Sequence, residues 1–171
     1  GVQTCALPIS DIAVVGEVRD REALPLMLTL SSGVKGFTTI HAGSARQALT
    51  RLRFICQLAE TGSELPLHAL NSLISEAIDL VVHCVRTPDG PRVASIVAVE
   101  DQLGPVDSAS FTTSALFERH RGEPGIRWSG TVPTRLSRAF DDAGMELRDF
   151  LADARLEDSH LDGSRHCEPR T

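Results

Sequence analysis

The sequence predicts an α/β fold in which parallel strands alternate with helices and a β-hairpin is added at an edge of the sheet. Two short apolar segments rich in β-branched residues, 11–17 and 37–40, are each followed by a segment that favours a helix. Two Val-rich segments, 78–86 and 92–100, flank a Thr-Pro-Asp-Gly-Pro stretch that is typical of a tight turn. The alternating part therefore precedes the hairpin.

Three helices are expected between these strands. The first begins near Leu24, because the proline that follows fits only the first turn of a helix. Ser44 and Gln47 have the spacing of a capping box, so a second helix starts there and runs to about Ala59. The third covers residues 66–77, where apolar residues recur every three or four positions.

The pattern weakens after residue 101. Residues 111–117 and 126–128 are candidates for short elements, and residues 133–151 for one or two amphipathic helices around Gly144. The polar and charged residues 152–171 have no periodicity, so disorder is expected there.

Composition excludes several classes of protein. The net charge of -6 leaves no broad basic face, so binding of nucleic acid is not expected. The four cysteines are scattered without a Cys-x-x-Cys pair, which supports neither a metal site nor a disulfide framework. No apolar run is long enough for a membrane span.

The first nine residues, GVQTCALPI, have neither charge nor periodicity. They resemble the translation of a sequencing-library adapter. We therefore exclude residues 1–9 from the predicted fold as an artefactual leader. We expect the natural sequence to begin near Ser10, inside a domain, so that the chain is a fragment.

Polar residues follow the first two predicted strands. Glu17, Arg19 and Asp20 come at the carboxyl end of the first strand, the edge at which open α/β sheets bind ligands. A carboxylate there can hold a magnesium-bound water or accept a proton from an attacking water. Thr39 and His41 lie at the end of the second strand, where it leads into a helix start, and a polar strand end of this kind suits a phosphate sensor. Each group alone also fits a solvated or structural side chain.

Three motifs in order resemble the secretion and pilus-assembly ATPases of type II and type IV systems, and most closely the tight-adherence pilus ATPases. Residues 11–20, DIAVVGEVRD, match the Walker B element of that family. Residues 36–44, GFTTIHAGS, match its His box, and residues 48–52 match its Ala-Leu-x-Arg-Leu helix. The resemblance covers about residues 10–100.

The resemblance implies two catalytic residues. Glu17 would polarise the attacking water, and His41 would either sense the γ-phosphate or contact the adjacent subunit, with Thr39 supporting it.

Further residues would act around that pair. Arg19 and Asp20 would hold the Walker B strand to neighbouring loops, and Arg51 would either brace the site or form a structural ion pair. Arg46 and Arg53 are expected on a solvated or subunit-facing surface.

The implied fold is a partial RecA-like P-loop NTPase core that lacks its P-loop half. Residues 10–103 would be the carboxy-terminal part of the secretion ATPase domain, residues 104–151 a small C-terminal extension, and residues 152–171 a disordered tail. No segment reads Gly-x-x-x-x-Gly-Lys-Ser/Thr, and the single lysine, Lys35, is in no such motif. The chain alone is therefore expected to be inactive and to bind no cofactor.

The parent protein is expected to be a homo-hexamer that hydrolyses ATP with Mg²⁺ and contacts inner-membrane platform proteins from the cytoplasmic face of the plasma membrane. A conjugal transfer ATPase and a stand-alone regulatory domain without catalysis remain alternatives. A hydrolase that uses His41 with Ser44 or Thr39 as nucleophile lacks the Gly-x-Ser-x-Gly elbow.

Overall fold

The computed structural model describes residues 12–59, 65–101, 110–120, 122–123, 125–153 and 156–157. The expectations for the leader 1–9 and for residues 158–171 lie outside the described residues, as does Asp11 of the Walker B match.

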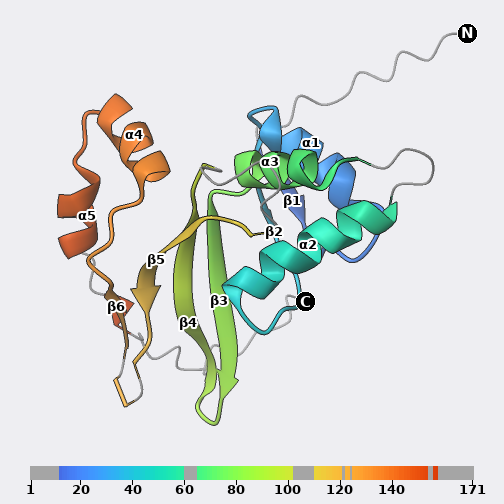
Figure 1. Cartoon of the computed structure of the whole chain (residues 1–171). Helices are drawn as coiled ribbons and strands as arrows, with labels where there is room; N and C mark the ends of the chain where they lie inside the picture. Colours follow the sequence, from blue (N-terminus) through green and yellow to red (C-terminus); the bar gives the residue numbers. More distant parts are fainter. Residues whose placement is uncertain are drawn as a thin grey trace, which may run out of the picture.

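The first half of the chain forms a parallel strand pair with helices. Strands β1 (Ile12–Val15) and β2 (Lys35–Thr38) run parallel, and helix α1 (Ala23–Ser31) connects them. Helix α2 (Ala45–Ala59) follows β2. The parallel pair and the start of α1 next to Pro25 confirm the sequence prediction. Figure 1 shows this pair beside α1, α2 and α3.

The predicted capping box at the start of α2 is present. The Ser44 hydroxyl accepts a hydrogen bond from the Gln47 amide at 3.2 Å. The Gln47 side chain in turn accepts one from the Gly43 amide at 3.1 Å. These bonds satisfy amides that have no partner inside the helix, and so they fix where α2 begins.

Helix α3 (Leu67–Ala77) leads into the predicted hairpin of β3 (Leu80–Thr87) and β4 (Gly90–Val99). Gly90 has a φ of 110°, a conformation that the turn requires and that glycine adopts without strain. The hairpin lies apart from the parallel pair, in a second, antiparallel sheet of order β3-β4-β5-β6-β7. This placement corrects the expectation that the hairpin extends the parallel sheet.

The second sheet is completed by segments whose sequence signal was weak. Strands β5 (Thr113–Glu118) and β6 (Gly125–Trp128) continue it, and helices α4 (Thr134–Asp142) and α5 (Leu147–Asp153) follow. Strand β7 (Leu156–Glu157) pairs with β6. Ordered structure therefore continues past residue 152, where the sequence predicted disorder.

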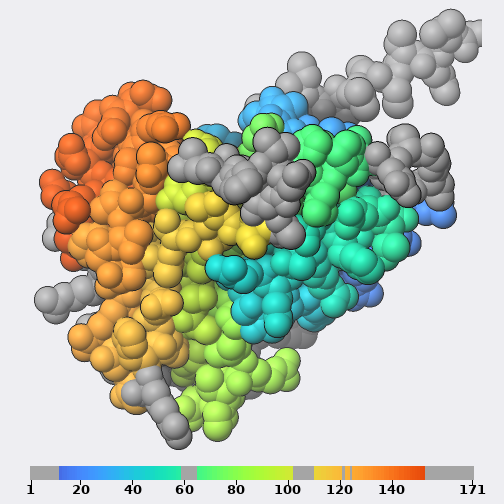
Figure 2. Space-filling model, viewed as in Figure 1, coloured from blue at the N-terminus to red at the C-terminus, as the bar shows by residue number. Residues whose placement is uncertain are grey.

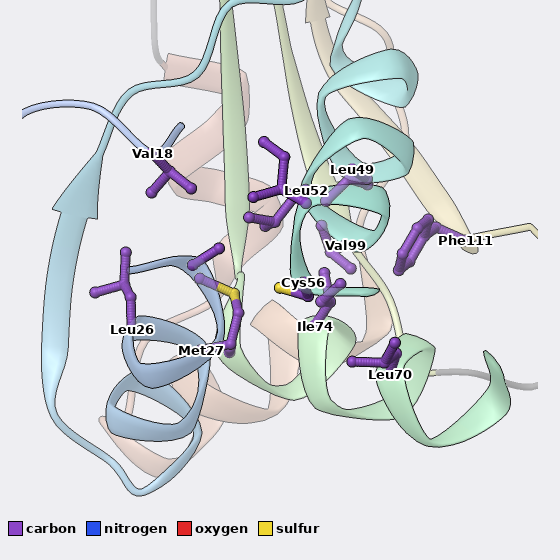
Figure 3. Close-up of a cluster of buried hydrophobic side chains, with 13 residues drawn as sticks. Val18, Leu26, Met27, Leu49, Leu52, Cys56, Leu70, Ile74, Val99 and Phe111 are labelled. Carbon is purple, nitrogen blue, oxygen red and sulfur yellow. The ribbon is translucent and has the colours of Figure 1, made fainter. Parts of the chain in front are cut away.

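Two apolar clusters lie on either side of β4. Ala98 belongs to the cluster under α4 and α5, whereas the next residue, Val99, belongs to the cluster formed by α1, α2 and α3. Successive residues of a strand point to opposite faces, so one strand serves both clusters. Figure 3 shows the first cluster, and Figures 1 and 2 show the C-terminal elements on the far side of the hairpin from α1–α3. The labelled members of the first cluster are Val18, Leu26, Met27, Leu49, Leu52, Cys56, Leu70, Ile74, Val99 and Phe111.

Candidate functional site

The candidate site lies where β1 and β2 end. The last pair of the parallel register is Val15 with Thr38, so both chains leave the sheet at the same edge. Glu17 lies in the loop that follows β1, and His41 lies in the loop that follows β2. The parallel arrangement therefore brings together two motifs that are far apart in the sequence.

The Glu17 carboxylate is bound on both of its oxygens. The Arg19 guanidinium donates to Oε2 at 2.5 Å, and His41 Nε2 lies 3.4 Å from Oε1. The Glu17 side chain is 23% exposed, whereas those of Arg19 and His41 are 71% and 82% exposed. The carboxylate is therefore partly shielded from solvent, whereas its two partners are mostly exposed.

These contacts keep Glu17 ionised. The hydrogen bond from Arg19 is the largest cause that lowers the pKa of Glu17 from 4.5, and the charges of Arg19, His41 and Arg51 act in the same direction against partial desolvation. The same bond raises the pKa of Arg19. At neutral pH the carboxylate is a hydrogen-bond acceptor with lone pairs left for a further donor such as water.

Thr39 joins the two motif loops. Its hydroxyl donates to the Gly16 carbonyl at 2.6 Å, and its own carbonyl accepts a hydrogen bond from the Val18 amide at 2.9 Å. The sequence reasoning placed Thr39 in support of His41. Its hydrogen bonds instead reach the backbone on both sides of Glu17.

Glu22 is a residue of the site that sequence reasoning missed. Its Oε1 accepts hydrogen bonds from the amides of Arg19 at 2.6 Å and Asp20 at 3.1 Å. The bond from the Arg19 amide is the largest cause that lowers the pKa of Glu22. The sequence offered only a carboxylate immediately before a helix, and this carboxylate bonds to the amides of the preceding loop and not to those of the helix.

The other predicted residues are not all in the cluster. Arg51 is on the exposed side of α2, and its charge acts on Glu17. The Asp20 side chain is exposed and makes no hydrogen bond or ion pair with the described residues. The expected surface position of Arg53 was wrong, because the residue is half-buried. It donates a hydrogen bond to Asn71 at 3.2 Å, and its guanidinium lies 5.7 Å from the Phe111 ring centre.

This edge carries an acceptor group with open space beside it. Glu17 supplies a carboxylate, and a Cβ added at Gly16 would meet nothing within 4 Å, so a ligand can approach beside it. Lys35 is at the opposite end of β2 from Thr39, so the only lysine does not reach the site. No group of three or more His, Cys, Asp or Glu residues suited to a metal ion occurs among the described residues.

Comparison with known protein families shows which family this chain matches. The model of the type II/IV secretion system protein family matches residues 9–116, which is more than half of the sequence. The chain belongs to the type II/IV secretion system protein family. All six residues singled out from the sequence as site residues fall inside the match to this family.

Individual relatives match a shorter stretch. The probable conjugal transfer protein TrbB of Sinorhizobium fredii (strain NBRC 101917 / NGR234) is 44% identical over 91 residues, and the conjugal transfer protein TrbB of Rhizobium radiobacter is 38% identical over 91 residues. Each match covers 53% of this chain and 26% of the relative. The chain thus matches about a quarter of the length of these curated relatives.

A solved structure is also similar. The VirB11 ATPase from the Brucella suis type IV secretion system, in complex with sulphate, matches with a TM-score of 0.48 and 24% identity, over 52% of this chain and 27% of that chain. Within the part of this secretion-family chain that the structure describes, no helix combines the length and apolarity needed to cross a membrane.

Proposed function

We propose that this chain is part of an ATP-hydrolysing subunit that powers a secretion, conjugation or pilus machine, with Glu17 and His41 at its catalytic edge. The observation that carries the proposal is the contact of Glu17 with Arg19 and His41 at the carboxyl ends of two parallel strands. Such an edge is where α/β sheets bind ligands, and a held carboxylate there suits phosphoryl transfer.

The proposed role of Glu17 is to orient the attacking water. The pKa of Glu17 lies below 4.5, so the carboxylate is ionised at neutral pH and accepts a hydrogen bond from water. Its hydrogen bond from Arg19 fixes one oxygen, so the direction in which it presents a lone pair is restricted. Orientation rather than complete proton removal fits a carboxylate of low basicity.

His41 and Arg51 would supply positive charge near the transferred phosphoryl group. His41 is 82% exposed and therefore accessible to a phosphate or to a neighbouring subunit. The charge of Arg51 already acts on Glu17, so it can also stabilise negative charge that develops beside that carboxylate. Mg²⁺, when bound with ATP, supplies neutralisation of the phosphate oxygens.

The machine and the assembly form part of the same proposal. Two relatives named as conjugal transfer proteins support conjugal transfer more than tight-adherence pilus assembly. We expect a homo-hexamer at the cytoplasmic face of the plasma membrane, in contact with inner-membrane platform proteins. Phe54 and Leu58, one turn apart on α2, are 59% and 67% exposed and offer an apolar surface to a neighbouring subunit.

The test is a Glu17→Gln variant of a longer protein that contains this sequence. Removal of the charge takes away the acceptor that orients water, so kcat for ATP hydrolysis should fall roughly 100-fold or more, with little change in KM. A Glu118→Gln variant, at an exposed glutamate at the end of β5, is the matched control and should keep wild-type kcat.

The outcomes separate cleanly. Unaltered hydrolysis in Glu17→Gln would refute the role of Glu17. The 171-residue chain by itself serves as the nucleotide-binding control, because its sequence lacks a phosphate-binding lysine motif. We expect no thermal stabilisation of this chain by Mg-ATP, and a clear stabilisation would contradict that part of the proposal.

A further inference from the structure

Thr39 is the residue that connects the loop after β1 to the loop after β2. Its hydroxyl donates to the Gly16 carbonyl, and its carbonyl accepts a hydrogen bond from the Val18 amide, at 2.6 and 2.9 Å. These two bonds meet the chain immediately before and immediately after Glu17. A single residue therefore restrains the backbone on both sides of the carboxylate.

The two sides of Glu17 are otherwise held very differently. Val18 is 2% exposed and is part of the first apolar cluster, so packing already fixes that side. Gly16 has no side chain, and a Cβ placed on it would meet no atom within 4 Å. Glycine has the largest backbone freedom of any residue. The Thr39 hydroxyl thus restrains Gly16 where packing does not.

Thr39 also precedes His41 by two residues. His41 Nε2 lies 3.4 Å from Glu17 Oε1, so Thr39 joins the backbone segments from which both side chains of that contact extend.

The Thr39 hydroxyl has only one proton. That proton is donated to the Gly16 carbonyl, so the hydroxyl cannot at the same time donate to a phosphate oxygen. To bind a phosphate, the Thr39 hydroxyl would have to direct its proton toward the phosphate oxygen and give up the bond to the Gly16 carbonyl.

We infer that Thr39 is a positioning residue that sets the Glu17 carboxylate against His41, and that it does not bind phosphate itself. The catalytic consequence rests on the proposed function, whereas the positional claim can be tested without it.

The positional claim is tested on the 171-residue chain by ¹³C NMR titration of the Glu17 carboxyl carbon. Thr39→Val keeps the shape of the side chain and removes the hydroxyl, whereas Thr39→Ser keeps the hydroxyl. We expect the pKa of Glu17 to rise toward 4.5 in Thr39→Val, because the contribution of His41 weakens while that of Arg19 remains. Thr39→Ser should titrate like the wild type.

A residue that only stabilised the fold would give a different result. Thr39→Val would then lower the melting temperature and leave the pKa of Glu17 unchanged, which would overturn the inference. Equal shifts in Thr39→Ser and Thr39→Val would overturn it too, because the hydroxyl would then not be the cause.

The catalytic consequence is tested in a longer protein that contains this sequence. Thr39→Val should lower kcat for ATP hydrolysis roughly five- to ten-fold at unchanged KM, the size expected for one lost hydrogen bond. Thr39→Ser should stay near wild type. A raised KM with unchanged kcat would identify Thr39 as a phosphate ligand and overturn the inference. If Glu17→Gln left hydrolysis unaltered, the proposed role of Glu17 in catalysis would fail, and the NMR titration would still decide whether Thr39 positions its carboxylate.

Discussion

Arg19 in the loop after β1 and Arg51 in α2 favour the ionised form of the Glu17 carboxyl group. Arg19 contributes most, through a hydrogen bond at 2.5 Å, and it does so from only two residues further along the chain. His41, when protonated, and Arg51 add to the effect from greater sequence distance. The dominant partner of Glu17 is therefore local, and the remaining ones depend on the fold.

Replacement of Arg19 should be visible at Glu17. In Arg19→Gln we expect the pKa of Glu17 to rise toward 4.5, because the largest cause of its lowering is gone. A lowered pKa in the folded state stabilises the fold above pH 4.5, and this contribution is lost as the pH falls through the folded pKa. The stability difference between wild type and Arg19→Gln should accordingly be present at neutral pH and vanish in acid.

The measurements are a carboxyl ¹³C titration and urea unfolding at several pH values. Arg46→Gln, on the exposed surface of α2, is the matched control and should leave the titration of Glu17 unchanged. An unchanged Glu17 titration in Arg19→Gln would show that the Arg19 hydrogen bond does not control this carboxylate.

The sequence predicted those residues of the site that follow directly from the ends of the two strands. Glu17 and His41 were each predicted to follow a strand, and because the two strands run parallel and end at one edge, the two side chains lie 3.4 Å apart. Glu22 was missed because its carboxylate turns back onto amides three and two residues earlier, which no apolar periodicity signals. Arg53 was misplaced because its long side chain reaches Asn71 from a position that reads as a helix surface.

At the scale of elements, two glycines of the parallel layer differ in what surrounds them. A Cβ on Gly36, in β2, would lie 2.5 Å from Leu30 Cδ2 and 2.6 Å from the Ala13 carbonyl oxygen. The first contact can relax by side-chain rotation, but the second is with the backbone of the paired strand. Close packing of α1 onto the two strands therefore depends on glycine at this position.

Gly36→Ala should lower the free energy of unfolding by about 1–3 kcal/mol, the usual cost of overpacking. Thermal unfolding followed by circular dichroism measures it. Gly16→Ala is the matched control, because Gly16 has no positive φ and an added Cβ has open space, so its stability should be unchanged or slightly higher. Equal melting temperatures for Gly36→Ala and wild type would show that α1 does not pack this closely.

The elements themselves followed from local signals where those signals were strong. Ser44 and Gln47 predicted the start of α2, and the Asp-Gly turn predicted the hairpin. The pairing partner of that hairpin was not predictable, because β5 has mixed apolar and polar residues and pairs with β4 across more than a dozen residues of the chain. Strand pairing depends on cross-strand neighbours, which the pattern of one segment does not contain.

At the scale of the whole molecule, Glu100 and Arg135 link the two apolar clusters. Glu100 is 8% exposed, and its carboxylate accepts hydrogen bonds from the amides of Thr134 and Arg135 at the start of α4, at 3.3 and 3.2 Å. The Arg135 guanidinium donates to the carbonyls of Ser75 and Glu76 at the end of α3 and pairs with Asp79 at 2.8 Å. Each group thus sits at the helix end whose dipole it complements.

This link predicts how the molecule unfolds. Trp128, the only tryptophan, packs against the cluster under α4 and α5, so its fluorescence reports on that half, while the far-ultraviolet circular dichroism is dominated by α1–α3. In wild type we expect the two urea transitions to coincide.

Arg135→Ala removes several charge-assisted hydrogen bonds, at a cost of about 1.5–3 kcal/mol, and should move the Trp128 transition to lower urea than the circular dichroism transition. Arg138→Ala, on the same helix, breaks only an exposed pair with Asp101, so both transitions should stay together near their wild-type midpoints. Coincident transitions in Arg135→Ala would show that the sheet through β4, and not this link, couples the two clusters.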